Sequence, residues 1–143
     1  MPRALPTLTA TPTLLPNACF LNPDPAGPDI TAVEEPREND VLTSPAQVRG
    51  WGAGIGFEDA GVLVMIYDAV GEPVAQGRAA PLSPPEGHVP PPTLQVGEFT
   101  APFAVDISFR TTVAQPGCVC VFQLSAADGS PIHVVQIAVL LRP

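Results

Sequence analysis

Proline is the residue that most constrains how this chain can fold. The 143-residue sequence contains 20 prolines, of which nine lie in the first 45 residues and six lie between Pro81 and Pro92. Proline has no backbone N–H and a fixed φ, so it is excluded from helix interiors and from central strands. The two proline-rich stretches are therefore predicted to be a linker and a loop.

The first 29 residues are predicted to be a flexible tether. Threonine alternates with proline as far as Pro16, and the turn-forming stretches 22–25 and 27–29 follow. Pro/Thr-rich segments are extended and are typical of surface stalks. Residues 30–143 are then predicted to form one folded domain, which is long enough to bury a core.

The balance of apolar and charged residues indicates a packed, acidic domain. Hydrophobic residues make up 45% of the chain and charged residues 14%, whereas disordered chains show the reverse balance. The formal net charge is −8 and all six basic residues are arginines, which argues against nucleic acid and anionic membrane surfaces as partners. No apolar run reaches the roughly 18 residues of a membrane span, and no export signal is visible in this chain.

From residue 30 onward, the pattern is that of short strands separated by turns. Residues 62–67 are consecutive apolar residues, which favours a buried strand, and residues 103–109 alternate with the period of a half-buried strand. Asp128-Gly129 predicts a hairpin with a primed turn. The predicted strands cover residues 30–33, 47–51, 62–67, 73–76, 103–109, 118–124 and 132–141. About seven strands without an amphipathic helix predict an all-β fold, namely an immunoglobulin-like β-sandwich with Greek-key connections.

An ordered set of short motifs runs along this domain. The motifs are Ser44-Pro45, Val48-Arg49-Gly50, Phe57-Glu58, the apolar strand 62–68 with Gly71, the Phe-led strand 103–109, Gly117 and the hairpin 125–130. With this set, residues 33–141 resemble the immunoglobulin-like domain of bacterial spore germination, a family that accompanies GerMN domains. The resemblance implies an extracytoplasmic, non-catalytic accessory module.

The three cysteines are the strongest candidates for covalent chemistry. Cys118 and Cys120 are two residues apart on a predicted strand, so both point to one face, while Val119 and Val121 point to the other, which is the expected core. Exposed thiols on an outer face are reactive. Cys19 could fold back and form a disulfide with either of them, which would pin the tether across the sheet. Free or buried thiols, a bridge between Cys118 and Cys120, and intermolecular pairing are the alternatives.

Arg49, Trp51 and Tyr67 are the candidates for a partner-binding surface. A tryptophan on a sandwich strand usually packs in the core, but Trp51 could instead be an exposed platform, with Arg49 on the same face and Tyr67 adding to it. No nucleophile or phosphate-binding motif is present, and Cys-x-Cys with two distant histidines lacks the spacing of a zinc site. We therefore predict no enzyme activity, no cofactor and no metal site.

Three binding functions remain open. The first is a non-catalytic binding or adaptor module of the bacterial cell envelope, linked to sporulation or germination and acting on an unknown protein. The second is a glycan- or peptidoglycan-binding domain that uses Trp51. The third is a protease-inhibitor-like sandwich that presents the loop of residues 80–92, because proline-stiffened loops lose little entropy on binding. We expect the protein to be secreted or held at the cell surface.

Overall fold

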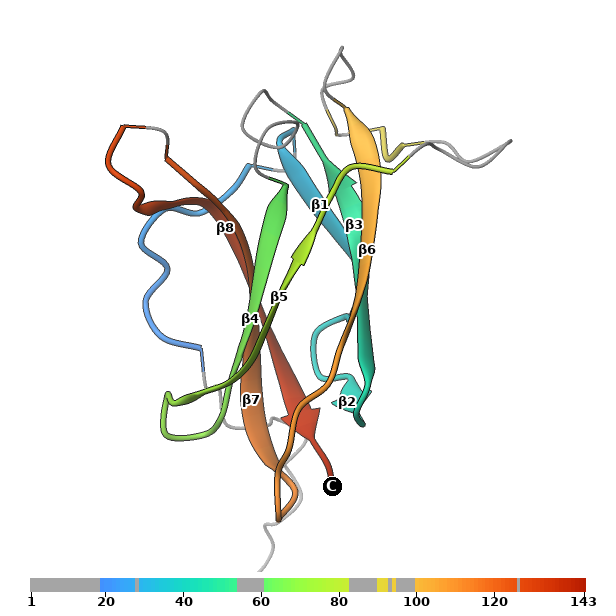
Figure 1. Ribbon diagram of the computed structural model, residues 1–143, viewed down its shortest axis with the longest axis vertical. Helices are drawn as coiled ribbons and strands as arrows, with labels where there is room; N and C mark the ends of the chain where they lie inside the picture. Colours follow the sequence, from blue (N-terminus) through green and yellow to red (C-terminus); the bar gives the residue numbers. More distant parts are fainter. Residues whose placement is uncertain are drawn as a thin grey trace, which may run out of the picture.

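The chain folds into two β-sheets that face each other (Figure 1). The computed structural model describes residues 19–27, 29–53, 61–82, 90–92, 94, 100–125 and 127–143. These residues contain eight strands and no helix. The strands are β1 (Thr31–Glu35), β2 (Val41–Leu42), β3 (Ala46–Gly52), β4 (Val62–Tyr67), β5 (Pro73–Ala79), β6 (Ala101–Ile107), β7 (Gln115–Leu124) and β8 (Pro131–Leu141).

The smaller sheet has the strand order β1-β3-β6, and the larger sheet has the order β2-β8-β7-β4-β5. Neighbouring strands are antiparallel, except that β2 runs parallel to β8. The predicted all-β class is confirmed, and each of the seven predicted strands has a counterpart. The eighth strand, β2, is two residues long, which is too short to leave a periodic signal in the sequence.

The main core lies between the two sheets and is formed by alternate residues of each strand. Its fully buried side chains include Val62, Val64 and Ile66 on β4, Val119 and Val121 on β7, and Phe103 on β6. Burying one such side chain is worth about 1.5–3 kcal/mol relative to leaving it exposed. The apolar alternation read from the sequence therefore corresponds to the main source of stability.

The outer edge of β8 is covered by other parts of the chain. Residues 19–27, here called the N-terminal segment, run beside it (Figure 1): Val134 N donates to Asp24 O at 2.8 Å, and Val134 O accepts from Ala26 N at 3.0 Å. Further along, Ala138 O accepts from Asn39 N at 2.7 Å, and β2 pairs with the end of the strand. Uncovered strand edges recruit other chains. The described part of the predicted tether is thus bonded to the sheet.

The hairpin between β7 and β8 forms, but with a different turn from the one predicted. Ser125 N donates to Ser130 O at 2.8 Å, and Gly129 N donates to Ser125 O at 2.9 Å. Gly129 has a φ of 74°, whereas Asp128 does not have a positive φ. A type I′ turn needs positive φ at both central residues, so the primed turn is wrong. The bond between Ser125 and Ser130 instead closes a longer loop, within which the Asp128 carboxylate accepts bonds from the N and Oγ of Ser130, at 3.0 and 2.7 Å.

Gly50 lies on β3 at a point where β1 passes very close. A Cβ atom at this position would overlap the carbonyl oxygen of Ala32 and would lie 2.9 Å from the Cα of Val33. Both atoms belong to the backbone of β1, so neither can rotate away. The pairing of β1 with β3 therefore requires a residue without a side chain here.

We predict that Gly50→Ala lowers the free energy of unfolding by about 1–3 kcal/mol, because β1 must move away from β3 to accept the methyl group. Chemical denaturation of the purified variant measures this loss. Gln47→Ala is the matched control, since Gln47 is an exposed residue of the same strand and such a change stays within about 0.5 kcal/mol. Equal stabilities of the two variants would contradict the close approach.

Candidate functional site

Cys19 and Cys118 form a disulfide bond in the structure, with their Cα atoms 5.0 Å apart and a separation of 99 positions in sequence. This is one of the pairings of Cys19 that the sequence leaves open. The bond ties the N-terminal segment to β7. Next to it, the ring of Phe20 meets the ring of Tyr67 on β4 edge to face, with centroids 5.2 Å apart. The segment therefore lies across the outer face of the five-stranded sheet.

Cys120 is a free thiol beside this disulfide. Its Sγ lies 3.8 Å from the Sγ of Cys118, and both cysteines point away from the core that contains Val119 and Val121, as the alternation predicts. This outer face is nevertheless buried, because Cys118 has 0% and Cys120 only 3% of its surface accessible. The sheet is thus buried on both faces at β7.

The environment of Cys120 keeps its thiol protonated. Burial raises the pKa of the Cys120 thiol to about 11, and the neighbouring Gln136 side chain on β8 opposes that rise in part. Burial also raises the pKa of the nearby Tyr67 phenol, with a smaller contribution from the charge on Cys120. A thiol is nucleophilic only as its thiolate, so Cys120 is placed for reaction but held in its unreactive form.

Arg49, Trp51 and Tyr67 do not form a common surface. Arg49 and Trp51 lie on β3 in the smaller sheet, whereas Tyr67 lies on β4 in the larger one. Trp51 has 2% of its surface accessible and packs with Ala53 and Leu94 in a second core cluster. A buried indole presents no face to a glycan, so the exposed platform is wrong and the core interpretation of Trp51 holds.

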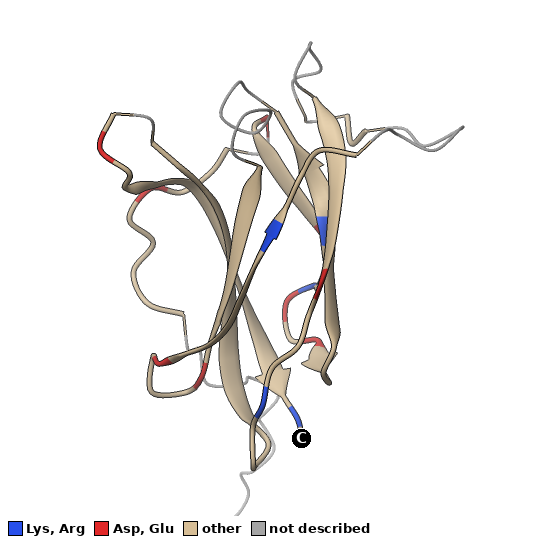
Figure 2. Ribbon diagram, in the orientation of Figure 1, with Lys and Arg blue, Asp and Glu red and all other residues tan. Residues whose placement is uncertain are grey.

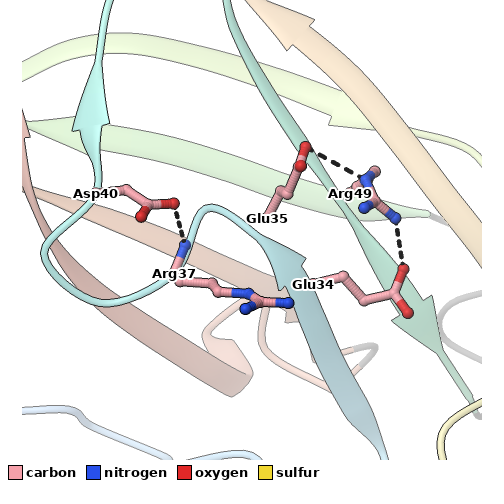
Figure 3. Close-up of polar contacts among 5 residues, drawn as sticks. All are labelled: Glu34, Glu35, Arg37, Asp40 and Arg49. Atoms are coloured by element: carbon pink, nitrogen blue, oxygen red, sulfur yellow. Dashed lines mark hydrogen bonds and ion pairs between the residues drawn. The ribbon is translucent and has the colours of Figure 1, made fainter.

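Arg49 is engaged by two glutamates of β1 (Figure 3). Its Nη1 donates to Glu34 Oε1 at 2.7 Å, and its Nε lies 3.3 Å from Glu35 Oε1. The register between β1 and β3 shifts between Val33 and Glu35, and such an irregularity lets consecutive side chains reach the same partner. The guanidinium of Arg49 therefore stabilises the smaller sheet.

A cavity of about 490 Å³ lies at one end of the sandwich, and we call it the end cavity. Its walls come from the β2–β3, β4–β5 and β6–β7 connections and from the residues after β8, so it lies beside the end marked C in Figure 1. The polar residues of its lining include Thr43, Ser44, Asp68, Arg110, Thr112 and Arg142. Sandwich domains commonly carry their ligand contacts on the loops at their ends.

Two guanidinium groups line the end cavity, and the described residues supply no ion-pair partner to either. Arg110 follows β6 and Arg142 follows β8, and both are exposed. Figure 2 shows arginine segments beside the end marked C. Asp68 belongs to the same wall, but its Oδ1 accepts bonds from Val70 N at 3.0 Å and Glu72 N at 2.9 Å within the β4–β5 turn. The lining of the end cavity therefore carries two guanidinium groups and one carboxylate that is bonded within its own turn.

The walls of the end cavity are joined to one another by hydrogen bonds. Phe109 N donates to Ser44 Oγ at 2.9 Å. The side chain of Gln115 connects two further walls, accepting from Ala69 N at 3.2 Å and donating to Thr111 Oγ1 at 2.7 Å. A ligand that enters would meet a surface already ordered, which lowers the entropy cost of binding.

The sequence did not predict this pair of arginines. Arg110 and Arg142 are 32 positions apart, and each simply follows an apolar strand. Only the topology, which brings the ends of β6 and β8 to the same end of the sandwich, places them on one cavity. The sequence signal for this pair was the presence of two arginines directly after predicted strands in a chain without lysine. The strand pattern alone does not show which strand ends lie at the same end of the sandwich.

The third predicted binding element, the loop of residues 80–92, lies mostly outside the described residues, because its residues 83–89 are not among them. Within the described part of the chain, no group of three or more His, Cys, Asp or Glu side chains could hold a metal ion. The same residues contain no helix with the length and apolar character of a membrane span. No protein-family model and no curated protein matches the chain.

We predict that Cys19→Ser lowers the free energy of unfolding by about 2–4 kcal/mol, because the disulfide that closes a long loop no longer restricts the unfolded chain. Denaturant titrations of the variant and the oxidised wild type measure the difference. A reductant should destabilise the wild type by a similar amount and leave the Cys19→Ser variant unchanged. If reduction destabilises both proteins equally, the loss does not come from the Cys19–Cys118 bond.

We predict that the native protein reacts with an alkylating agent at a rate that keeps rising with pH toward about 11, the pKa of the Cys120 thiol. Free cysteine levels off near its ordinary pKa of about 8.5. Total thiol consumption, followed from pH 7 upward in about half-unit steps, measures this profile. Gln136→Leu removes the polar side chain that lowers the pKa, so its profile should move to higher pH. A plateau near pH 9 in the wild type would contradict the burial of the thiol.

Proposed function

We propose that this protein is a non-catalytic, extracytoplasmic immunoglobulin-like binding module of the bacterial cell envelope, linked to sporulation or germination. Its end cavity binds a carboxylate or another anionic group, carried either by an acidic protein segment or by a cell-wall polymer. The carrying observation is that Arg110 and Arg142 line the same preformed cavity without an ion-pair partner among the described residues.

The order of the strands supports the immunoglobulin-like part of this proposal. In variable-type immunoglobulin domains, strands A, B and E belong to one sheet, and strands G, F, C and C′ are neighbours in the other. The orders β1-β3-β6 and β8-β7-β4-β5 follow the same sequence of strands, with β2 added beside β8. The chain crosses between the sheets after β3, β5 and β6, which supports Greek-key connections.

Two further observations support the location and the lack of catalysis. A long-range disulfide such as Cys19–Cys118 persists in oxidising compartments outside the cytoplasm. The motifs shared with the spore-germination immunoglobulin-like family imply an accessory module that carries no chemistry of its own. The end cavity agrees with a binding role, since its arginine and hydroxyl side chains are donors that can recognise anions.

The geometry also indicates which ligand chemistry fits. Guanidinium groups bind carboxylates and phosphates through paired N–H donors, and the hydroxyls of Thr43, Ser44 and Thr112 add donors to the same lining. The surrounding molecule is acidic, so an extended polyanion would be repelled by most of its surface. The cavity therefore suits a short acidic group that projects from a larger partner.

We predict that Arg110→Gln and Arg142→Gln each weaken binding of an acidic ligand about 10- to 100-fold, the equivalent of one charged hydrogen bond of about 1.5–3 kcal/mol. Calorimetric titration with a short polyglutamate peptide, and co-sedimentation with isolated bacterial cell wall, are the two measurements. If the two variants weaken binding of the peptide, the anionic group belongs to an acidic protein segment. If they weaken binding of the cell wall, it belongs to a cell-wall polymer.

Arg37→Gln is the matched control, because it removes the same charge from an exposed turn outside the end cavity. The control should bind like the wild type. If all three variants bind equally weakly, the loss of affinity comes from the change in net charge and not from the end cavity. If the wild type binds neither probe, the proposed function is wrong.

A further inference from the structure

We propose that the Cys19–Cys118 disulfide is an exchangeable latch, and that Cys120 is the internal thiol that opens it. Opening the latch frees the Cys19 end of the N-terminal segment from the outer face of the five-stranded sheet. This inference goes beyond the proposed binding function and does not depend on it. It rests on three sulfur atoms that the fold gathers at one place on β7.

The geometry places the Cys120 sulfur against the disulfide. Cys118 and Cys120 point to the same face of β7, and their Sγ atoms are 3.8 Å apart, which is contact distance for two sulfur atoms. Both are buried, so the internal thiol reaches the disulfide more readily than a thiol from solvent. Exchange begins with a thiolate attacking one sulfur of a disulfide, and here the contacted sulfur is that of Cys118.

The exchange is balanced without any other reactant. The Cys120 thiol gives up its proton, and its sulfur forms a bond to the Sγ of Cys118. The bond between Cys118 and Cys19 breaks, its electron pair leaves on the Cys19 sulfur, and that sulfur takes up a proton. One disulfide and one thiol are present before and after, so the step consumes neither an oxidant nor a reductant.

The Cys118–Cys120 bond formed by the exchange has a less favourable geometry than the Cys19–Cys118 bond that it replaces. The exchange can therefore run back to the starting disulfide. Residues i and i+2 of a strand lie about 6.4–6.8 Å apart, at the upper limit of the Cα separation that a disulfide spans, whereas the Cα atoms of Cys19 and Cys118 are 5.0 Å apart. The closed latch is thus the favoured isomer. The open isomer is the one in which Cys19 carries the free thiol.

Opening the latch moves only one end of the N-terminal segment. Asn22 Nδ2 donates to Val134 O at 2.9 Å, and Asp24 Oδ2 accepts from His133 N at 3.1 Å. These bonds to β8 do not involve the disulfide, so residues 22–26 stay on the edge of the sheet. Cys19, Phe20 and the 92% exposed Leu21 are the residues that lose their covalent tie to β7, and Phe20 is the one whose ring covers Tyr67.

The neighbours of Cys120 define the conditions for a test. On β4 it faces Met65, its partner in the register, and Tyr67, whose phenol is the titratable group that interacts with it among the described residues. On β8 it faces the neutral Gln136. Across from it on the N-terminal segment, the disulfide partner Cys19 does not titrate. Burial raises the pKa of the phenol above its ordinary value, so between about pH 7.5 and about pH 9.5 the change in ionisation at this place is mainly that of the Cys120 thiol.

The experiment traps the exchanged thiol in the full, oxidised chain. The protein is incubated with an excess of iodoacetamide across this pH range, quenched with acid, and digested without reduction for peptide mapping. We expect the label on Cys19 together with a Cys118–Cys120 disulfide, formed at an initial rate that rises about tenfold per pH unit, as the thiolate fraction does below the pKa. The rate should not change with protein concentration.

Two variants show which thiol is responsible. Cys120→Ser should yield no label on Cys19, and Cys120→Ser combined with Val121→Cys should also yield none, because residue 121 faces the core on the opposite side of β7. Circular dichroism of each protein at each pH establishes that it is folded. Label on Cys120 with the Cys19–Cys118 bond intact, or label on Cys19 in the Cys120→Ser variant, would overturn the latch.

Discussion

The structure depends on β7 being apolar on both of its faces. Val119 and Val121 close the core between the sheets, and Cys118 and Cys120 are equally buried on the opposite side. A strand of this kind needs cover on both sides, as in sheets that lie between two layers. The smaller sheet supplies one cover, and the N-terminal segment, held by the Cys19–Cys118 bond, supplies part of the other. The disulfide thus holds the N-terminal segment against the outer face of β7, which a third layer of secondary structure would otherwise cover.

Local patterns were sufficient to predict the strands but not what covers them. The six apolar residues of β4 and the alternation of β6 carry their own signal, since each reflects burial of that strand. The attachment of Asp24 and Ala26 to Val134 joins residues more than 100 positions apart, and no local pattern encodes it. The choice of Cys118 over Cys120 has the same origin, because alternation places both on one face and only the path of the segment distinguishes them.

The candidate binding residues show the same contrast: the local sequence pattern predicts their strands, whereas contacts between distant parts of the chain decide their surroundings. Trp51 was correctly assigned to a strand, but β3 is buried on both sides at this end because Leu94 returns to pack against it. The sequence predicts that Arg49 belongs to a partner-binding surface, whereas the irregular register of β1 places two glutamates beside its guanidinium. Arg110 and Arg142 belong to no sequence motif. They line one cavity only because β6 and β8 end at the same end of the sandwich. Each of these outcomes is set by long-range topology.

The latch and the end cavity are neighbours along β4 and β7, yet the bonding makes them mechanically separate. Tyr67, which the N-terminal segment covers, is followed directly by Asp68 in the cavity wall. The turn that begins at Asp68 is closed by its own bonds to Val70 and Glu72 and is held to β7 by Gln115, none of which involves the segment. Removing Phe20 from Tyr67 would expose the outer face without releasing this turn. One sandwich can therefore carry a preformed anion-binding end and a separately exchangeable cover on its outer face.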